Sequence, residues 1–233
     1  RSPAAPHPFV LEVAAKPERG RRREMVGLTM IGRGQQHAAY LIHALGQAGA
    51  QGLRPENVPL QLVEVERESE AGSGKWVSAV GESGLEISQS MELNAPPEPR
   101  SLEILFHTPI RLKRDNDLLT PATFELSDLI KAVVRRLAML CEYHTDTPWT
   151  PDFRAVMDAA GLVRWSEKDL GWLEWTRVSQ KQKTEMQMGG IVGCGRVDGD
   201  AWRPWWPLLW LGQFAGAGKA TSMGLGRYEV RPP

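Results

Sequence analysis

The chain has little cysteine, no long hydrophobic run and no net charge. Its 233 residues include two cysteines, Cys141 and Cys194, far apart in sequence, which argues against a disulfide framework or a cysteine metal site and favours a reducing, cytoplasmic compartment. The longest strongly apolar segment, residues 205–211, is too short to span a bilayer, which needs about 20 residues, so a membrane protein is excluded. Because 28 basic residues balance 28 acidic ones, any nucleic-acid site must be a local patch.

Proline is concentrated in one internal segment. Residues 94–99 read Asn-Ala-Pro-Pro-Glu-Pro, and prolines at this density interrupt helices and central strands. We therefore predict two domains, residues 1–98 and residues 99–233. The chain begins at Arg1 without an initiator methionine, so we expect it to start inside a longer gene product.

The first domain alternates short strand patterns with one helical pattern. Strands are predicted at residues 9–14, 26–31 and 60–65, a helix at 35–50, and a β-ribbon at 76–80 and 85–91. Acidic side chains between Glu64 and Glu70, followed by Gly72-Ser73-Gly74, are typical of a solvated strand end and hairpin loop.

The second domain repeats the alternation more fully. Its strands are predicted at residues 102–112, 170–178, 186–197 and 226–230. Its helices are predicted at residues 125–142, 152–160 and 205–211. This β-α-β-β-α-β order is that of the ferredoxin-like fold, in which an antiparallel sheet carries helices on one face. The predicted fold class is therefore α+β.

The most distinctive motif is the glycine-rich segment before the last strand, residues 216–226. Its glycines surround Lys219, so backbone N–H groups are expected to lie exposed beside a positive charge. That arrangement holds a phosphate without reading a base. A simple chain reversal between helix and strand is the alternative.

The segment does not match a nucleotide-binding P-loop. The leading glycine of Gly-x-x-x-x-Gly-Lys-Ser/Thr would fall at Gln213, and Ala220 stands where the magnesium-binding hydroxyl is required. A P-loop also follows a strand and opens a helix, whereas this segment follows a helix-like run and precedes a strand. It therefore suits a polynucleotide backbone better than a nucleoside triphosphate.

The tip of the predicted hairpin, residues 179–185, is polar and basic. Lys181 and Lys183 alternate with glutamines, and Arg177 stands at the base of the tip. Ammonium groups bind phosphates, and amides bind base edges or riboses, so this tip suits a nucleic-acid groove. A solvated loop is the alternative, because polar hairpin tips are common.

Tryptophan is abundant, with nine residues, which raises the possibility of base stacking. Most of these side chains alternate along strands or cluster in the apolar helix, and this pattern favours core packing instead. The six tryptophans assigned to the core are Trp172, Trp175, Trp202, Trp205, Trp206 and Trp210.

The predicted helix at residues 35–50 carries the candidate catalytic residues. Tyr40 and His43, at i and i+3, lie within reach of one bound group, with His37 beside them. They serve either as base and acid, or as a ribose-binding pair, or form a solvated helix face. We expect His107 to be structural and His144 to suit the dipole at a helix end.

Five motifs in order along the chain carry a family resemblance. They are Gly32-Arg33, residues 108–112, the hairpin segment 175–182, Met188-Gly189-Gly190 and the glycine-rich segment 216–226. Together they resemble the CRISPR-associated RAMP endoribonucleases, which process precursor CRISPR RNA. The resemblance covers most of the chain and is most specific from residue 101 to residue 230.

The resemblance implies tandem ferredoxin-like domains, the first lacking its initial strand and helix in this chain. It implies cleavage of one RNA phosphodiester without metal or cofactor: the ribose 2′-hydroxyl attacks the phosphorus and leaves a 2′,3′-cyclic phosphate. The RNA-binding residues would be Arg33, Arg111, Lys113, Arg177, Lys181, Lys183, Gly216, Gly218, Lys219, Gly224 and Gly226. Met223 stands where a phenylalanine is more usual in the family, so the loop shape is expected to differ slightly.

The resemblance leaves the general base open. In the family it generally lies on the first helix of the first domain, so it is either upstream of Arg1 or among His37, Tyr40 and His43. Two other classes of function also remain. One is a catalytically silent RAMP subunit that binds CRISPR RNA within an effector complex, and the other is a ferredoxin-like protein-interaction module that binds no RNA.

Overall fold

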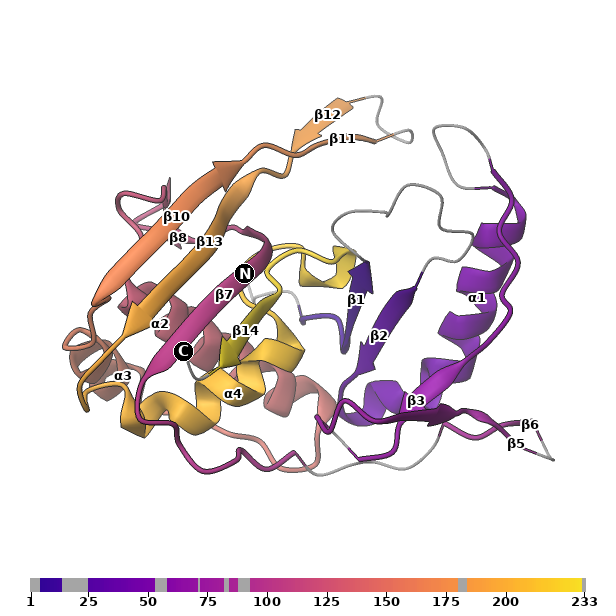
Figure 1. Cartoon of the computed structure of the whole chain (residues 1–233), viewed down its shortest axis with the longest axis horizontal. Helices are drawn as coiled ribbons and strands as arrows, with labels where there is room; N and C mark the ends of the chain where they lie inside the picture. The colour runs from indigo at the N-terminus through magenta and orange to yellow at the C-terminus, as the bar shows by residue number, and fades with distance from the viewer. Residues whose placement is uncertain are drawn as a thin grey trace. The chain divides into compact units, whose positions relative to one another are not determined.

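The computed structural model of the chain describes residues 5–13, 25–52, 58–70, 72–81, 84–87, 93–179 and 184–231 (Figure 1). The chain forms two compact units. The sheet unit comprises Arg1–Thr29 and Asn94–Pro233, and the helix unit comprises Met30–Leu93. The domain limits expected from the sequence, 1–98 and 99–233, stay a prediction.

A four-stranded antiparallel sheet organises the sheet unit. Its strands lie in the spatial order β10 (Glu167–Leu173), β13 (Gly190–Val197), β7 (Leu102–Ile110) and β14 (Tyr228–Arg231). The helices α2 (Leu126–His144) and α4 (Trp206–Ala215) connect them in the β-α-β-β-α-β order. The ferredoxin-like prediction for this part of the chain is confirmed, because β13 separates the two strands joined by α2.

Smaller elements decorate this unit. They are the paired strands β1 (Phe9–Val13) and β2 (Val26–Met30), the hairpin β8 (Lys113–Arg114) and β9 (Asp117–Leu118), the helix α3 (Phe153–Ala160), and the 3₁₀ turns η2 (Arg203–Trp205) and η3 (Thr221–Met223). The strands β11 (Thr176–Ser179) and β12 (Thr184–Gln187) extend the β10–β13 hairpin beyond the four-stranded sheet (Figure 1).

Helix α2 begins with a reciprocal cap and buries one face. The Glu125 side chain accepts from the backbone of Asp128, and the Asp128 carboxylate accepts the Glu125 N–H at 2.9 Å. Arg114 forms an ion pair with the same carboxylate, which ties β8 to the helix start. The apolar side chains of α2 face the sheet, as their spacing predicted.

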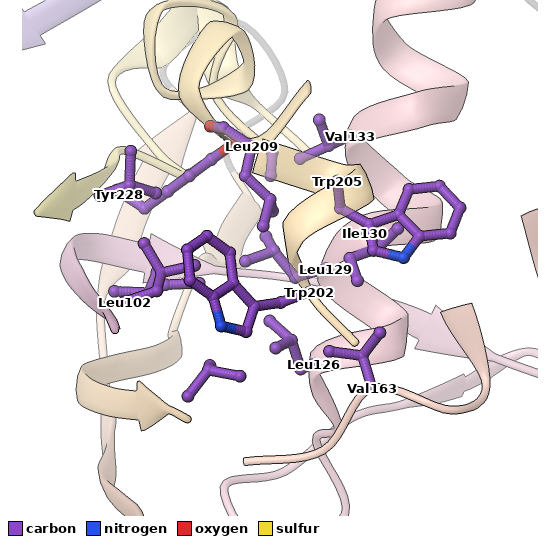
Figure 2. Packing of buried hydrophobic residues seen from close by; sticks show 14 of the residues in the cluster. Leu102, Leu126, Leu129, Ile130, Val133, Val163, Trp202, Trp205, Leu209 and Tyr228 are labelled. Atoms are coloured by element: carbon purple, nitrogen blue, oxygen red, sulfur yellow. Dashed lines mark hydrogen bonds between the residues drawn. The ribbon is translucent and has the colours of Figure 1, made fainter. Parts of the chain in front are cut away.

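The core lies between the sheet and its helices. Figure 2 shows side chains of α2, α4 and β14 meeting there, together with Trp202 and Trp205 from the turn before α4. The buried Tyr228 hydroxyl donates to the Leu209 carbonyl at 2.8 Å, and burial raises the pKa of Tyr228 well above its usual value. This bond joins α4, which precedes the glycine-rich segment, to β14, which follows it.

Two of the six tryptophans assigned to the core are not in it. Trp202, Trp205 and Trp206 are buried and Trp210 packs against the core, but Trp172 and Trp175 keep 39% and 43% of their surface exposed. The prediction was wrong for these two because alternation along a strand does not show where the covering helices end. Trp172 lies near the far end of β10, and Trp175 lies in the link that follows.

The helix unit contains η1 (Gly32–His37), α1 (Ala38–Ala50) and two short strand pairs. Strand β3 (Glu66–Glu68) pairs with β4 (Trp76–Ser78), and β5 (Val80–Gly81) pairs with β6 (Gly84–Leu85). The predicted helix at 35–50 is therefore α-helical only from Ala38. The second arm of the predicted ribbon falls partly at residues 88–91, outside the described residues.

The strand predicted at residues 60–65 is wrong. Those residues form no strand, and the pairing begins at Glu66, inside the acidic run. The Glu68 carboxylate accepts N–H groups from Gly72 at 2.8 Å and Gly74 at 3.1 Å, which closes the β3–β4 loop and sets the register. The hairpin loop itself is where the sequence predicted it. No helix in the described ranges is both long and apolar enough to cross a membrane.

Candidate nucleic-acid interface

Three of the motifs meet at the end of β7. The Lys219 N–H donates to the Arg111 carbonyl at 3.2 Å, and the Gly226 N–H donates to the Pro109 carbonyl at 3.0 Å. The Arg111 guanidinium donates through Nη1 to the Gly189 carbonyl at 2.6 Å. The structure thus joins residues 108–113, residues 188–190 and the glycine-rich loop 216–226 into one group, the β7-end cluster.

Glycine is required at two positions of this loop. Gly218 has φ +89°, and a Cβ there would lie 2.6 Å from the Arg111 carbonyl oxygen. Gly226 has φ +71°, and a Cβ there would overlap the Ala217 carbonyl oxygen. Both residues combine a left-handed backbone with close contact to another peptide group, so any side chain is excluded sterically.

Much of the loop backbone is engaged within the protein. The N–H groups of Ala217, Lys219, Leu225 and Gly226 donate to the carbonyls of Gly226, Arg111, Ala220 and Pro109. The expectation that this loop presents its N–H groups to a phosphate is therefore wrong for these four. Their bonds instead make the loop a fixed support, from which the Lys219 side chain extends into solvent.

The other implied RNA-binding residues lie in different places. Lys113 is exposed in β8, next to the half-buried Arg111. Gly216, the first residue of the loop, and Gly224, two residues before its end, are both buried with positive φ. Arg177 lies in β11 opposite Met186, whereas Lys181 and Lys183 lie outside the described residues. Arg33 is exposed in η1 of the helix unit.

The candidate catalytic side chains lie together at the start of α1. His37 ends η1, and Tyr40 and His43 follow on the first turns of α1; all three are exposed, Tyr40 by 72%. The ring Nε2 of His37 lies 3.3 Å from the Gln36 amide nitrogen. The side chains are therefore accessible to a large ligand such as RNA.

His107 and His144 have partners within the protein, which for His107 agrees with the structural role expected from the sequence. His107 Nε2 lies 2.9 Å from Glu229 Oε2 across β7 and β14, and His144 Nε2 lies 2.6 Å from the Pro6 carbonyl oxygen. Both bonds connect segments more than 100 residues apart in sequence, so both histidines stabilise the fold of the sheet unit.

Arg136 supports the loop in a way that the sequence did not indicate. Helical spacing places it off the apolar face of α2, yet its Nε donates to the Ala215 carbonyl at 2.6 Å, directly before Gly216. Burial lowers the pKa of Arg136 to about 10, so the guanidinium stays protonated at neutral pH. A cation at the C-terminal end of α4 suits the helix dipole and anchors Ala215, the residue directly before the loop.

The fold and the β7-end cluster define the class of this protein. It is a ferredoxin-like α+β protein with a basic, glycine-rich loop between its last helix and last strand. Residues 104–228, more than half of the chain, match the family model described as CRISPR-associated endoribonuclease Cas6, and the chain belongs to this family. At the family level it is an RNA endonuclease of CRISPR repeat-RNA processing. Residues 1–92 match a second model, described as an N-terminal domain.

Solved Cas6 structures share the fold over almost the whole chain. Cas6 (TTHB231) in a product complex has a TM-score of 0.59 at 18% identity, covering 98% of this chain and 84% of that one. A second structure of that protein, described as Thermus thermophilus Cas6 (TTHB231), has a TM-score of 0.53 at 16% identity, covering 96% of this chain and 79% of that one. A partial Cas6-RT-Cas1–Cas2 complex has a TM-score of 0.54 at 13% identity, covering 97% and 39%. The tandem ferredoxin-like fold is therefore confirmed. A separate comparison with curated protein sequences found no match to this chain.

Proposed function

We propose that this protein binds CRISPR repeat RNA and cuts it at one phosphodiester without a metal ion. The observation that carries the proposal is the β7-end cluster, where three separate motifs place Lys219 on a fixed glycine-rich support. A cation on a rigid loop binds a backbone phosphate at little entropic cost, because the loop is ordered before the RNA arrives. Lys113 adds a second exposed cation on β8, which is tied to α2 through the Arg114–Asp128 ion pair.

The proposed chemistry uses the exposed side chains of α1. A base removes the proton of a ribose 2′-hydroxyl, and that oxygen attacks the adjacent phosphorus. The bond to the 5′-oxygen breaks, and an acid protonates the leaving oxygen, which gives a 2′,3′-cyclic phosphate and a 5′-hydroxyl. We assign the base to His43 and the acid to Tyr40, because histidine is the side chain that most often serves as a general base and the two lie at i and i+3. His37, at the start of the same helix, contacts the RNA beside them.

Cleavage in a chelator tests the mechanism. The longest available product of the gene, incubated with repeat RNA in excess EDTA, is expected to make one cut and leave a 2′,3′-cyclic phosphate. Product ends are read by mass spectrometry, and by the resistance of the 3′ end to phosphatase until acid opens the cyclic ester. A cut that needs magnesium, or that leaves a 3′-hydroxyl, contradicts the proposal. Binding without any cut indicates an RNA-binding subunit instead.

Lys219→Ala is expected to weaken repeat-RNA binding mainly through one lost phosphate contact. Because each neutralised phosphate releases counterions, the slope of log K against log salt should become shallower by about 1, and affinity should fall at low salt most strongly. Fluorescence anisotropy at several salt concentrations measures both quantities. Arg135→Ala, which removes the same charge from an exposed site on α2, is the control and should leave the slope unchanged. Equal slopes for Lys219→Ala and the wild type would exclude the phosphate contact.

A further inference from the structure

Four large apolar side chains are exposed on the extended hairpin that leads away from the β7-end cluster. They are Trp172, Leu173, Trp175 and Met186, each between 39% and 48% exposed. Trp172 and Leu173 are neighbours on β10 and point to opposite faces, so each side chain is considered by itself. Trp175 begins the hairpin motif 175–182, yet the family resemblance gives its ring no role, and an exposed aromatic ring is a candidate ligand contact.

Hydrogen bonds connect Trp175 to the β7-end cluster. The Met188 N–H donates to the Trp175 carbonyl at 2.6 Å, and the next residue, Gly189, accepts the Arg111 guanidinium. The Arg111 carbonyl in turn accepts the Lys219 N–H. Backbone atoms and the Arg111 side chain thus link Trp175 to the loop that bears Lys219.

Close packing keeps the link stiff. A Cβ at Gly189 would lie 2.9 Å from both the Leu173 carbonyl oxygen and Glu174 Oε1, so the two arms of the hairpin touch at that point. The backbone that carries Trp175 is therefore held by its partner arm. An aromatic ring on such a support loses little freedom when a ligand covers it.

The two exposed tryptophans differ in what surrounds their rings. The Trp172 indole N–H donates to Glu174 Oε2 at 2.9 Å, which places a carboxylate beside that ring and disfavours an approaching phosphate backbone. Trp175 follows Glu174 directly, but that carboxylate accepts the Trp172 indole N–H, and the ten residues after Trp175 contain Arg177, Lys181 and Lys183 against one acidic residue, Glu185. The net positive charge of the sequence that follows Trp175 favours a polyanion over an apolar protein partner.

We propose that Trp175 stacks on an unpaired base of the repeat RNA whose phosphates bind Lys219. This rests on the proposed function, since it requires that the protein bind repeat RNA. Aromatic faces accept any base, and proteins that hold single-stranded nucleic acid combine such faces with cations along the backbone. Trp175 then contributes affinity through the base, while Lys219 contributes through the phosphate.

The test compares Trp175→Ala, Trp175→Phe and Trp172→Ala by anisotropy with labelled repeat RNA. Trp175→Ala should bind roughly 5- to 150-fold more weakly at every salt concentration, with the salt slope unchanged, because stacking releases no counterions. Trp175→Phe should restore most of the affinity, and Trp172→Ala should bind like the wild type. Repeat RNAs carrying an abasic site at successive positions should identify one position that weakens the wild type but has no further effect on Trp175→Ala.

Each outcome separates this inference from the proposed function. Wild-type affinity in Trp175→Ala, while Lys219→Ala is weakened, overturns the stacking of Trp175 and leaves the proposed function standing. A loss in Trp175→Ala that Trp175→Phe does not restore, or that changes the salt slope, also overturns it. A wild-type protein that does not bind repeat RNA overturns the proposed function and this inference together. Thermal unfolding of each variant checks that the fold is kept.

Discussion

His43→Ala is expected to lower the single-turnover rate of repeat-RNA cleavage by about 10²- to 10⁴-fold while the RNA remains bound. The reason is that His43 is the proposed base, and a positioned base supplies an acceleration of this order. Its side chain is exposed on α1, so its removal leaves no cavity and should hardly change the stability of the helix unit. Rapid-quench cleavage assays with enzyme in excess, together with anisotropy on uncleaved RNA, measure the two quantities separately.

Two further variants sharpen the assignment. Tyr40→Phe removes only the hydroxyl and should slow the reaction by about 10²-fold or more, because the leaving oxygen loses its acid. Gln51→Ala, exposed at the end of the same helix, is the control and should cleave at the wild-type rate. If His43→Ala, Tyr40→Phe and His37→Ala all cleave at that rate, the base and acid lie elsewhere in the gene product.

Gly226→Ala is expected to destabilise the sheet unit by about 3 kcal/mol and to weaken RNA binding. A left-handed backbone costs a side-chain-bearing residue about 1–2 kcal/mol. Overpacking adds about 1–3 kcal/mol, since the new methyl group would overlap the Ala217 carbonyl oxygen. A loss of this size corresponds to a fall in Tm of roughly 6–12 °C. The loop must shift to admit the methyl group, which moves Lys219 away from its position beside Arg111.

Gly199→Ala is the matched control for this substitution. Gly199 has φ +78°, close to that of Gly226, but no atom lies within 4 Å of the Cβ that alanine would add. Its replacement should therefore cost only the backbone strain, about 1 kcal/mol, and leave RNA affinity unchanged. Differential scanning calorimetry and anisotropy on both variants measure the difference. Equal stability losses at the two positions would show that the close contact of Gly226 with Ala217 has no energetic role.

The elements of the sheet unit were predictable because long-period patterns specify them. The spacing of apolar residues along 125–142 predicted α2 to within two residues at each end, and alternation along 102–112 predicted β7. The strand predicted at residues 60–65 does not form. Residues 66–68 pair instead because the Gly72 and Gly74 N–H groups bind Glu68, and such a local bond leaves no periodic signal.

The candidate site was predictable only in part. The glycines around Lys219 are visible in the sequence, and the motif order indicated that residues 108–113, 188–190 and 216–226 act together. The sequence did not reveal that loop N–H groups bind β7 carbonyls, or that Arg136 anchors Ala215. These contacts join residues about 80 to more than 100 positions apart, and their partners are carbonyl groups that every residue possesses.

The sequence by itself determined the α+β class, the β-α-β-β-α-β order after residue 99 and the family resemblance, because periodicity and glycine spacing are local properties of the chain. Only the tertiary structure decided that Trp175 is exposed while Trp202 is buried, and that the Lys219 N–H donates to the Arg111 carbonyl. Burial depends on where helices from distant parts of the chain stop covering the sheet. A tryptophan therefore has the same local pattern whether it packs in the core or faces a ligand.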